Sequence, residues 1–481
     1  MRFRNTLLAL IVLAVLAGII YYYEYRGEDE RRAAEEAEKN ALTFEREKVK
    51  GIEIVRTGAP PISLKKESGA WVVAAPLQTR ADQEKVESLL SSLSWLRVEQ
   101  RLKDVTEPEL EGFKLKEPAG RITLELEEGK EPAVLRIGDK AAVGGNYYAA
   151  VPGSPEVLLV SSGVEQVLGS SLDALRYKKV VGLDAWKVAR FRIEKRDGGA
   201  VAFGRDEGED AWRLVSPIAF PADASKVQGL WFDMQSLEAE GFETESPSEL
   251  DLEKLGLDRP AVTLTVEAKE GAAPIIVAFG VPSGDSSPSD AAYARRSDMG
   301  AVMKVKRETL DKLGAAVSGL QEYRDSRAAP VDRFRLAGIE IQRAGGAVTL
   351  VKDEEASKWH WEKKDGPEMP SEEVNNLIDA IEGLKATEFI DSPGAGGEPP
   401  PALAITVREG GDEKGRSVTV KVAPAGGASG RRVISTASSS IYIVPEAAAE
   451  TLVDRADGIK APGDKPAEAA EPTGEPAEEV K

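Results

Sequence analysis

The chain contains one histidine, His360, which lies in the stretch SKWHW between Trp359 and Trp361. It contains no cysteine, which excludes disulfides, thiolate zinc sites, iron–sulfur ligation and a cysteine nucleophile. A serine–histidine–aspartate triad would have to use His360, and no G-x-S-x-G sequence supplies its serine. Any chemistry that requires a histidine therefore depends on this one residue.

Two short fragments resemble catalytic motifs without their context. The run from Ser63 to Lys66 matches S-x-x-K, but it lies in a strand-like segment and the pattern is common by chance. The run from Gly410 to Ser417 reads G-x-x-x-x-G-R-S, with arginine where a P-loop has the lysine that binds phosphate. Both of its flanks read as strands, whereas a P-loop joins a strand to a helix. We therefore interpret it as a charged hairpin loop.

Acidic residues are abundant but form no recognisable site. Asp285 and Asp290 lie in a polar loop that lacks the ligand spacing of an EF-hand. A glycosidase needs only a pair of carboxylates, yet none of the 82 acidic residues recurs in a context framed by glycine or aromatic residues. We therefore predict no catalytic, cofactor-binding or metal-binding residue and no cofactor, and we expect that the protein is not an enzyme.

The composition is that of a folded protein, with 42% hydrophobic and 30% charged residues in 481. At about 150 residues per domain, this length suggests about three domains. The net charge of −19 repels phosphate backbones, so we do not expect nucleic-acid binding.

The N-terminal segment reads as a membrane anchor. Thr6–Tyr23 contains no charged residue, and as a helix it would be about 27 Å long, close to the hydrocarbon thickness of a bilayer. Three tyrosines at its end fit an interfacial belt, and Arg2 and Arg4 before it predict a cytoplasmic N-terminus. We expect a single-pass inner-membrane protein with its body in the periplasm or outside the cell.

A cleaved signal peptide is the alternative, with cleavage after Ala17. The apolar run continues through Ile19 and Ile20, which favours an uncleaved anchor. A charged, alanine-rich segment follows and reads as a solvated helix or stalk, and the last residues are rich in proline, alanine and glutamate, which predicts disorder.

Between these ends the sequence repeats. Three stretches open alike: GIEIVR from Gly51, RFRIEK from Arg190 and GIEIQR from Gly338. Each alternates in the manner of a strand and is followed by a glycine turn, a second strand-like run and a tryptophan. These tryptophans are Trp71, Trp212 and Trp359, which places them 141 and 147 residues apart.

The rest of each copy also recurs. Fifteen residues after each tryptophan, a valine opens an apolar helical stretch; these valines are Val86, Val227 and Val374. A capping or helix-start signal precedes each stretch, namely Asp82, Asp223, and Pro370 with Ser371. Pro-Ala then leads into a strand-like run with a threonine at Thr123, Thr265 and Thr406. Further strand-like runs follow, and each copy closes with a strand into a short helix.

The predicted fold class is α+β: an N-terminal transmembrane helix, then three tandem domains of antiparallel strands, each with a packed helix. We divide the chain into a cytoplasmic N-terminus (1–5), a transmembrane anchor (6–23), a charged stalk (24–47), repeat unit 1 (48–182), repeat unit 2 (183–328), repeat unit 3 (329–457) and a disordered acidic tail (458–481).

The repeat also bears on His360. In a strand, Trp359 and Trp361 point to one face and His360 to the other. The corresponding positions in the other copies hold Val72 and Arg213. We therefore predict that His360 is a structural strand residue and that the three recurrent tryptophans are core residues.

Several of these stretches resemble a known bacterial family, the domain of unknown function 4340 family. In unit 1 the match is carried by GIEIVR, GAWVVAAPLQTRADQEKVESLLSSL, GFKLKEPAGRITLEL and LRIGD; in unit 2 by AWRLVSPIAFPADASKVQGL and LEKLGLDRPAVTLTV. Unit 3 matches more weakly, because its turn before the helix is longer. The resemblance implies an extracytoplasmic accessory role beside the permease and ATPase of an ABC-2-type transporter, and it supplies no catalytic residue.

We therefore expect a non-enzymatic, membrane-anchored accessory or binding protein of an ABC-type transport system, with the inner membrane and a permease or auxiliary subunit as its partners. Two alternatives stay open: a structural or adhesive envelope stalk, and an envelope glycan hydrolase that uses Asp and Glu. The cargo, the identity of the partner and the oligomeric state are not encoded in a readable motif.

Overall fold

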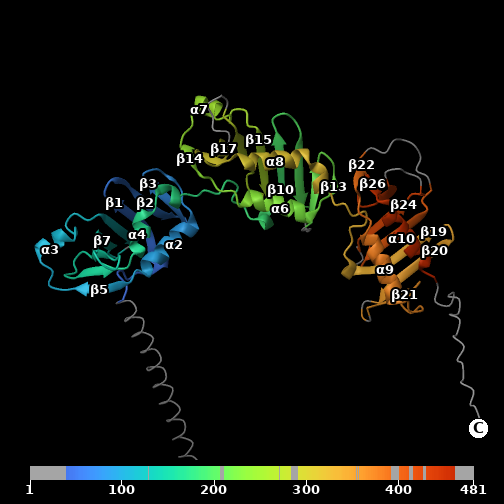
Figure 1. Cartoon of the computed structure of the whole chain (residues 1–481), viewed down its shortest axis with the longest axis horizontal. Coiled ribbons are helices and arrows are strands. Elements are labelled where there is room, and N and C mark those ends of the chain that lie inside the picture. The colour runs from blue at the N-terminus through green and yellow to red at the C-terminus, as the bar shows by residue number, and fades with distance from the viewer. Residues whose placement is uncertain are drawn as a thin grey trace, which may run out of the picture. The chain divides into compact units, whose positions relative to one another are not determined.

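A computed structural model describes residues 39–127, 129–205, 211–269, 271–282, 291–353, 355, 357–391, 400–410, 415–425 and 430–460. The chain forms two compact bodies, residues 1–178 and 179–481. The first contains one antiparallel sheet and the second contains two (Figure 1). The three sheets with their helices give an α+β repeat, as predicted.

Repeat unit 1 builds a nine-stranded sheet in the order β4-β3-β2-β1-β6-β7-β8-β9-β5. Its elements are η1 (Arg46–Lys48), β1 (Val49–Arg56), β2 (Ala59–Glu67), β3 (Ala70–Ala75), β4 (Thr79–Arg80), α2 (Gln83–Ser94), β5 (Val98–Leu102), α3 (Glu107–Gly112), β6 (Gly120–Leu126), β7 (Ala133–Lys140), β8 (Tyr147–Ala150), β9 (Val157–Val160), α4 (Gly163–Gly169) and α5 (Leu172–Leu175).

Repeat unit 2 builds a second nine-stranded sheet, β13-β12-β11-β10-β15-β16-β17-β18-β14. Its elements are η2 (Ala185–Lys187), β10 (Val188–Lys195), β11 (Ala200–Arg205), β12 (Trp212–Ser216), β13 (Phe220–Pro221), α6 (Ala224–Gln235), β14 (Gly241–Thr244), α7 (Glu249–Lys254), β15 (Val262–Ala268), β16 (Ile275–Gly280), β17 (Ala291–Arg296), β18 (Val302–Lys306), α8 (Arg307–Ser318) and η3 (Leu320–Tyr323).

Repeat unit 3 builds an eight-stranded sheet, β21-β20-β19-β23-β24-β25-β26-β22. Its elements are η4 (Arg333–Arg335), β19 (Leu336–Arg343), β20 (Gly346–Asp353), β21 (Lys358–Trp361), α9 (Ser371–Glu382), β22 (Glu388–Ile390), β23 (Leu403–Glu409), β24 (Ser417–Val422), β25 (Arg431–Ser435), β26 (Ile441–Val444) and α10 (Glu446–Gly458). Where units 1 and 2 have the two-residue strands β4 and β13, unit 3 has an isolated bridge between His360 and Glu368.

The three sheets share their central pairing. The first strand of each, β1, β10 or β19, lies between a hairpin partner and the Pro-Ala strand β6, β15 or β23. The recurrent threonines face the same register position, opposite Glu53, Arg192 and Glu340. Each first strand also shifts register at its start, so the same irregularity recurs three times.

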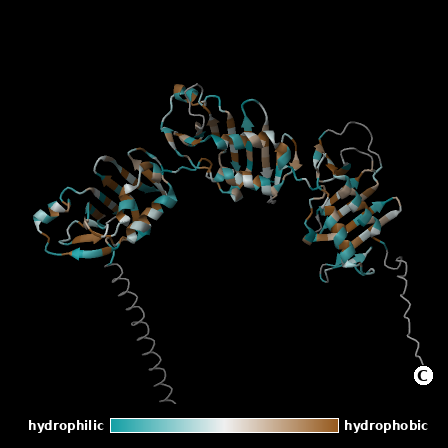
Figure 2. Ribbon diagram, in the orientation of Figure 1, coloured by the Kyte–Doolittle hydropathy of each residue, from teal (hydrophilic) through white to brown (hydrophobic). Residues whose placement is uncertain are grey.

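Each core lies on one face of its sheet. Apolar and polar residues alternate along the central strands (Figure 2), so one row of side chains is buried and the other is solvated. The long helices α2, α6 and α9 and the closing helices α4, α8 and α10 cover the buried row (Figure 1). Val86, Val227 and Val374 are fully buried at the starts of the long helices, as their spacing predicted.

Both ends of the predicted body need correction. Residues 39–47 were assigned to the stalk, but Ala41 and Leu42 are buried in the core of unit 1, and the amide of Ala41 bonds the carbonyl of Leu96 at 2.8 Å. At the other end Ile459 was assigned to the tail, yet it is buried against unit 3. The folded part therefore extends beyond 48–457. The residues that complete the cores at its ends are isolated apolar residues in charged segments, where they form no recognisable pattern.

The predicted anchor, Thr6–Tyr23, lies outside the described residues, as do residues 461–481 of the predicted tail. No helix in the described part of the chain is long and apolar enough to span a membrane.

Candidate functional site

The three recurrent tryptophans lie in the cores, and His360 lies in a strand. Trp71, Trp212 and Trp359 are each at most 5% exposed and belong to the cores. His360 is half-buried on the opposite face of β21 from Trp359, and its Nδ1 lies 2.9 Å from the carbonyl oxygen of Gly366. The prediction of three core tryptophans is confirmed, and His360 is a half-buried strand residue, as predicted.

Two of the motif fragments lie in a strand or between paired strands. Ser63 and Lys66 lie an odd number of residues apart in β2, so their side chains point to opposite faces of the sheet. The stretch from Gly410 to Ser417 joins β23 to β24, which pair antiparallel as a hairpin, as predicted. Asp285 and Asp290 lie outside the described residues. Among those that are described, no group of three acidic or histidine side chains is placed to hold a metal ion.

A groove of about 520 Å³ lies between repeat units 2 and 3, inside the second compact body. The start of α6, the turn η3 and the segment that enters β22 line it, together with the connector, which we define as residues 324–331. This groove is the candidate functional site.

The connector runs from unit 2 to unit 3 and pairs there with the segment that follows α9 in the chain. The amide of Ala328 donates to the carbonyl of Leu384 at 2.9 Å, and the amide of Ala386 donates to that of Ser326 at 2.8 Å. An isolated bridge joins Arg327 to Lys385. Unit 3 thus receives the connector as a short extra strand.

The same entry pairing occurs in the other two units. In unit 1 an isolated bridge joins Asn40 to Arg97. In the second body, Lys179 bridges to Glu238 at the start of unit 2. Every repeat unit therefore begins with a segment that pairs with the residues directly after its own long helix. Residues 179–182 consequently belong to the body of unit 2 rather than to unit 1.

A buried arginine fixes the connector. Arg324 is 3% exposed, and its two terminal nitrogens bond the two carboxylate oxygens of Asp391 at 2.6 and 2.8 Å. Ser440 donates to the same carboxylate at 2.9 Å. The guanidinium lies 5.1 Å from the ring centroids of both Phe220, from unit 2, and Phe389, from unit 3. This bidentate geometry makes a rigid contact between the units.

An aromatic cluster surrounds this pair. Phe220 packs edge-on against Phe389 at 5.2 Å between ring centroids, and its ring is tilted against that of Tyr442 at 5.7 Å. Burial raises the pKa of Tyr442 to about 12, so its hydroxyl stays neutral at physiological pH. The junction is therefore apolar inside and closed by one charge pair.

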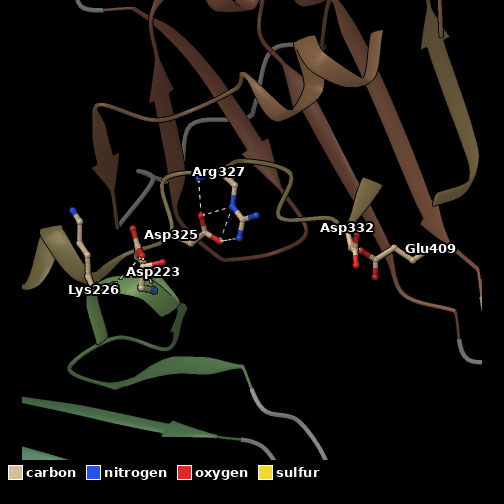
Figure 3. Close-up of polar contacts among 7 residues, drawn as sticks. Asp223, Lys226, Asp325, Arg327, Asp332 and Glu409 are labelled. Carbon is tan, nitrogen blue, oxygen red and sulfur yellow. Dashed lines mark hydrogen bonds and ion pairs between the residues drawn. The ribbon is translucent and has the colours of Figure 1, made fainter. Parts of the chain in front are cut away.

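Two further polar contacts hold the connector (Figure 3). Asp325, which is buried, accepts from the backbone amide of Arg327 at 3.0 Å and from its guanidinium at 2.7 Å. Directly after the connector, Asp332 caps η4, and its amide donates to the buried carboxylate of Glu409 at 2.7 Å. Side-chain and backbone bonds thus restrain the connector at both ends.

The Arg324–Asp391 pair should make the stability of the fold depend on pH. The hydrogen bond from Arg324 lowers the pKa of Asp391 below its ordinary value. Because the folded pKa is the lower one, the contribution of the pair is complete above about pH 4 and is lost as the pH falls through the folded pKa. We expect stability to fall more steeply as the pH drops below about 4 in the wild type than in Asp391→Asn. Urea unfolding of both proteins across this range measures the difference, and parallel curves would contradict the prediction.

The groove carries an excess of acidic side chains. Apart from Arg324, which pairs with Asp391, its charged lining consists of Asp223, Glu322 and Glu388 against Lys226. β22, at the edge of the sheet of unit 3, runs along it. An acidic groove beside a strand edge is a surface that an extended, basic segment can fill.

Sequence reasoning did not identify Arg324 or Asp391. One signal was available: Arg324 recurs as Arg176, which follows α5, the last helix of unit 1, and is 2% exposed. A buried arginine repeated at the end of a unit is a marker for the connection between units. Asp391 has no counterpart that the sequence repeat could have indicated.

The comparisons with known proteins agree with the repeat. No curated protein and no solved structure matches the chain. The family described as "Domain of unknown function (DUF4340)" matches three times, over residues 20–109, 71–211 and 212–404. The second and third matches begin at Trp71 and Trp212, two of the recurrent core tryptophans. Because these matches cover most of the 481 residues, the chain belongs to the DUF4340 family.

Proposed function

We propose that the protein is a non-enzymatic, single-pass envelope protein whose repeat units lie outside the inner membrane as the binding part of an ABC-type export system. One observation carries the proposal: the three units share the positions of their core residues and their entry pairing, but no polar constellation recurs among the residues that the structure describes. The position of His360 holds Val72 and Arg213 in the other copies. Repetition of a core without repetition of reactive groups is typical of a scaffold.

The groove between units 2 and 3 is the surface that we assign to the partner. Its walls belong to different repeat units, which the connector ties together, so its width is defined by the Arg324–Asp391 contact. Its charge favours a basic segment of the partner, and the edge of β22 offers backbone groups for strand addition. A permease or an auxiliary subunit of the transporter with such a segment is the partner we expect.

Two features of the N-terminus support the membrane part of the proposal. Thr6–Tyr23 has the length and composition of a span, and the preceding arginines orient it with the N-terminus in the cytoplasm. The acidic body would then work outside the membrane, close to the permease.

Affinity purification of the full chain from native membranes in mild detergent tests this function, with mass spectrometry of the proteins that follow. A chain that lacks residues 1–23 is the control. A permease or ATPase in stoichiometric amount, lost when the anchor is removed, is the result we expect. Recovery of the protein without a membrane partner would reject the transporter role and favour a structural or adhesive stalk.

A further inference from the structure

Another groove lies within repeat unit 2, along one side of the closing helix α8. We call it the α8 groove, and its volume is about 460 Å³. The hairpin between β10 and β11, the start of β15 and the residue after β16 line it opposite the helix, which lies across these strands (Figure 1). Its lining belongs to one repeat unit, so it is distinct from the groove between units 2 and 3.

In units 1 and 3, an arginine reaches from the first strand to the closing helix. The last residue of the first strand is Arg56 in unit 1 and Arg343 in unit 3. Each donates to a backbone carbonyl at or just after the end of the closing helix, at 2.8 and 3.0 Å. In unit 2 this position holds Lys195, which pairs with Asp197 of its own hairpin at 3.3 Å. The link between first strand and closing helix is thus replaced in unit 2, where the α8 groove lies.

Two arginines that line the α8 groove are specific to unit 2. Arg196 stands where units 1 and 3 have Thr57 and Ala344. Arg307 is the first residue of α8, whereas α10 begins with an acidic residue and α4 with a glycine. Unit 2 therefore gains cationic side chains at the place where its groove lies.

The lining of the α8 groove carries one positive charge in excess. Its cationic side chains are Lys195, Arg196 and Arg307, and its acidic ones are Asp197 and Asp311. Lys195 pairs with Asp197 at 3.3 Å, and Arg307 pairs with Asp311 at 3.5 Å. The exposed guanidinium of Arg196 donates to a neutral backbone carbonyl at 3.1 Å. Arg196 therefore supplies the positive charge that the groove offers to a ligand.

The floor of the α8 groove is apolar. Ala261, Val262 and Val281 line it from the side of the sheet, and Leu310 lines it from α8. Val262 and Leu310 are each 4% exposed, so they lie at the bottom of the groove. Gly314 also lines the groove, and a Cβ added there would meet no neighbouring atom within 4 Å. The absence of a side chain at this glycine leaves room for a ligand.

We propose that the α8 groove binds a small monocarboxylate with an aliphatic body. The carboxylate would pair with Arg196, because a guanidinium matches a carboxylate in shape and charge. The aliphatic part would lie on the apolar floor and leave water. A ligand with more negative charges would face Asp197 and Asp311, and a cation would face the excess positive charge. The volume of the groove is in the range of small-molecule sites, about 300–1,000 Å³.

Fluorine NMR of hexanoate with a trifluoromethyl end, mixed with the full chain in detergent, tests the proposal. The same detergent without protein is the blank. We expect a saturable broadening of the fluorine signal, which unlabelled hexanoate reverses. Arg196→Gln should weaken binding by roughly tenfold, because it removes the charge that pairs with the carboxylate. Arg295→Gln should have no effect, since it removes an exposed arginine from the open face of the same sheet.

A variant that fills the groove provides a second test and leaves every charge in place. Gly314→Leu puts a side chain into the groove and should abolish binding. The fold should be retained, because leucine is favoured over glycine inside a helix. Gly229→Leu is the matched control: this exposed glycine lies inside α6, its added Cβ would also meet no neighbouring atom, and the variant should bind normally. Circular dichroism of both variants verifies that they are folded.

Four outcomes would overturn the proposal. They are the absence of saturable binding, displacement of the probe by hexanol as effective as that by hexanoate, displacement by inorganic phosphate at the same concentration, and unchanged binding in Arg196→Gln or Gly314→Leu. The groove between units 2 and 3 does not enter this experiment, so this proposal and the proposed function can fail separately.

Discussion

Replacement of Trp212 by alanine should destabilise repeat unit 2 by about 3–5 kcal/mol, the usual cost of deleting a large buried aromatic side chain. Trp212 is 5% exposed and packs edge-on against Phe191 at 5.3 Å. The guanidinium of Arg205 lies 4.0 Å from its ring centroid. The substitution therefore leaves a cavity and removes a cation–π contact at once.

Hydrogen exchange followed by mass spectrometry measures this loss, because it reports on peptides of unit 2 separately from those of units 1 and 3. Trp186→Ala is the matched control: it removes the same side chain from the same unit, but from a site 64% exposed, and should change stability by less than about 0.5 kcal/mol. Equal effects of the two variants would contradict a core role for the recurrent tryptophan.

Replacement of Asp391 by alanine should loosen the junction between units 2 and 3 by about 3–5 kcal/mol. The substitution leaves the guanidinium of Arg324 without its carboxylate partner. The Arg324 side chain is 1% exposed and would remain charged between two aromatic rings. Arg324→Met should cost less, because Asp391 is 39% exposed and water can solvate it. The double variant should be more stable than Asp391→Ala alone, since no buried charge is left unpaired.

Exchange protection of the connector amide of Ala328, and of the amide of Ala386 that pairs with the connector, reports on this junction. Arg333→Ala is the control, because it breaks a pair with Asp379 in which both partners are exposed; such pairs contribute at most about 1 kcal/mol. If Asp391→Ala loses no more protection than Arg333→Ala, the buried pair does not hold the connector.

The repeat made much of the fold predictable. Alternating apolar residues located β1, β10 and β19, and the fixed spacing from each tryptophan located α2, α6 and α9 with their caps. These elements have one strongly apolar row, which is why pattern reasoning finds them. Asp82 and Asp223 accept backbone hydrogen bonds at the predicted helix starts, so the capping signal was correct as well.

The edge strands were missed for a physical reason. β5, β14 and β22 are three to five residues long and pair on one side only, so they have little buried face to leave an alternating pattern. The groove depends on one of these strands, β22, and on Arg324 and Asp391, which are 67 residues apart in the chain. Contacts of that range follow from tertiary packing, which a local pattern does not encode.

Site-specific photocrosslinking in living cells tests the central claim most directly, namely that the groove between units 2 and 3 receives a partner. The photoreactive residue would replace Lys226 or Glu388, two exposed positions on opposite walls of the groove. The control position is Glu194, an exposed residue on the open face of the unit 2 sheet. We predict that both groove positions capture the same component of the transporter and that Glu194 does not. Capture of that component from Glu194 alone, or from none of the three positions, would contradict the account.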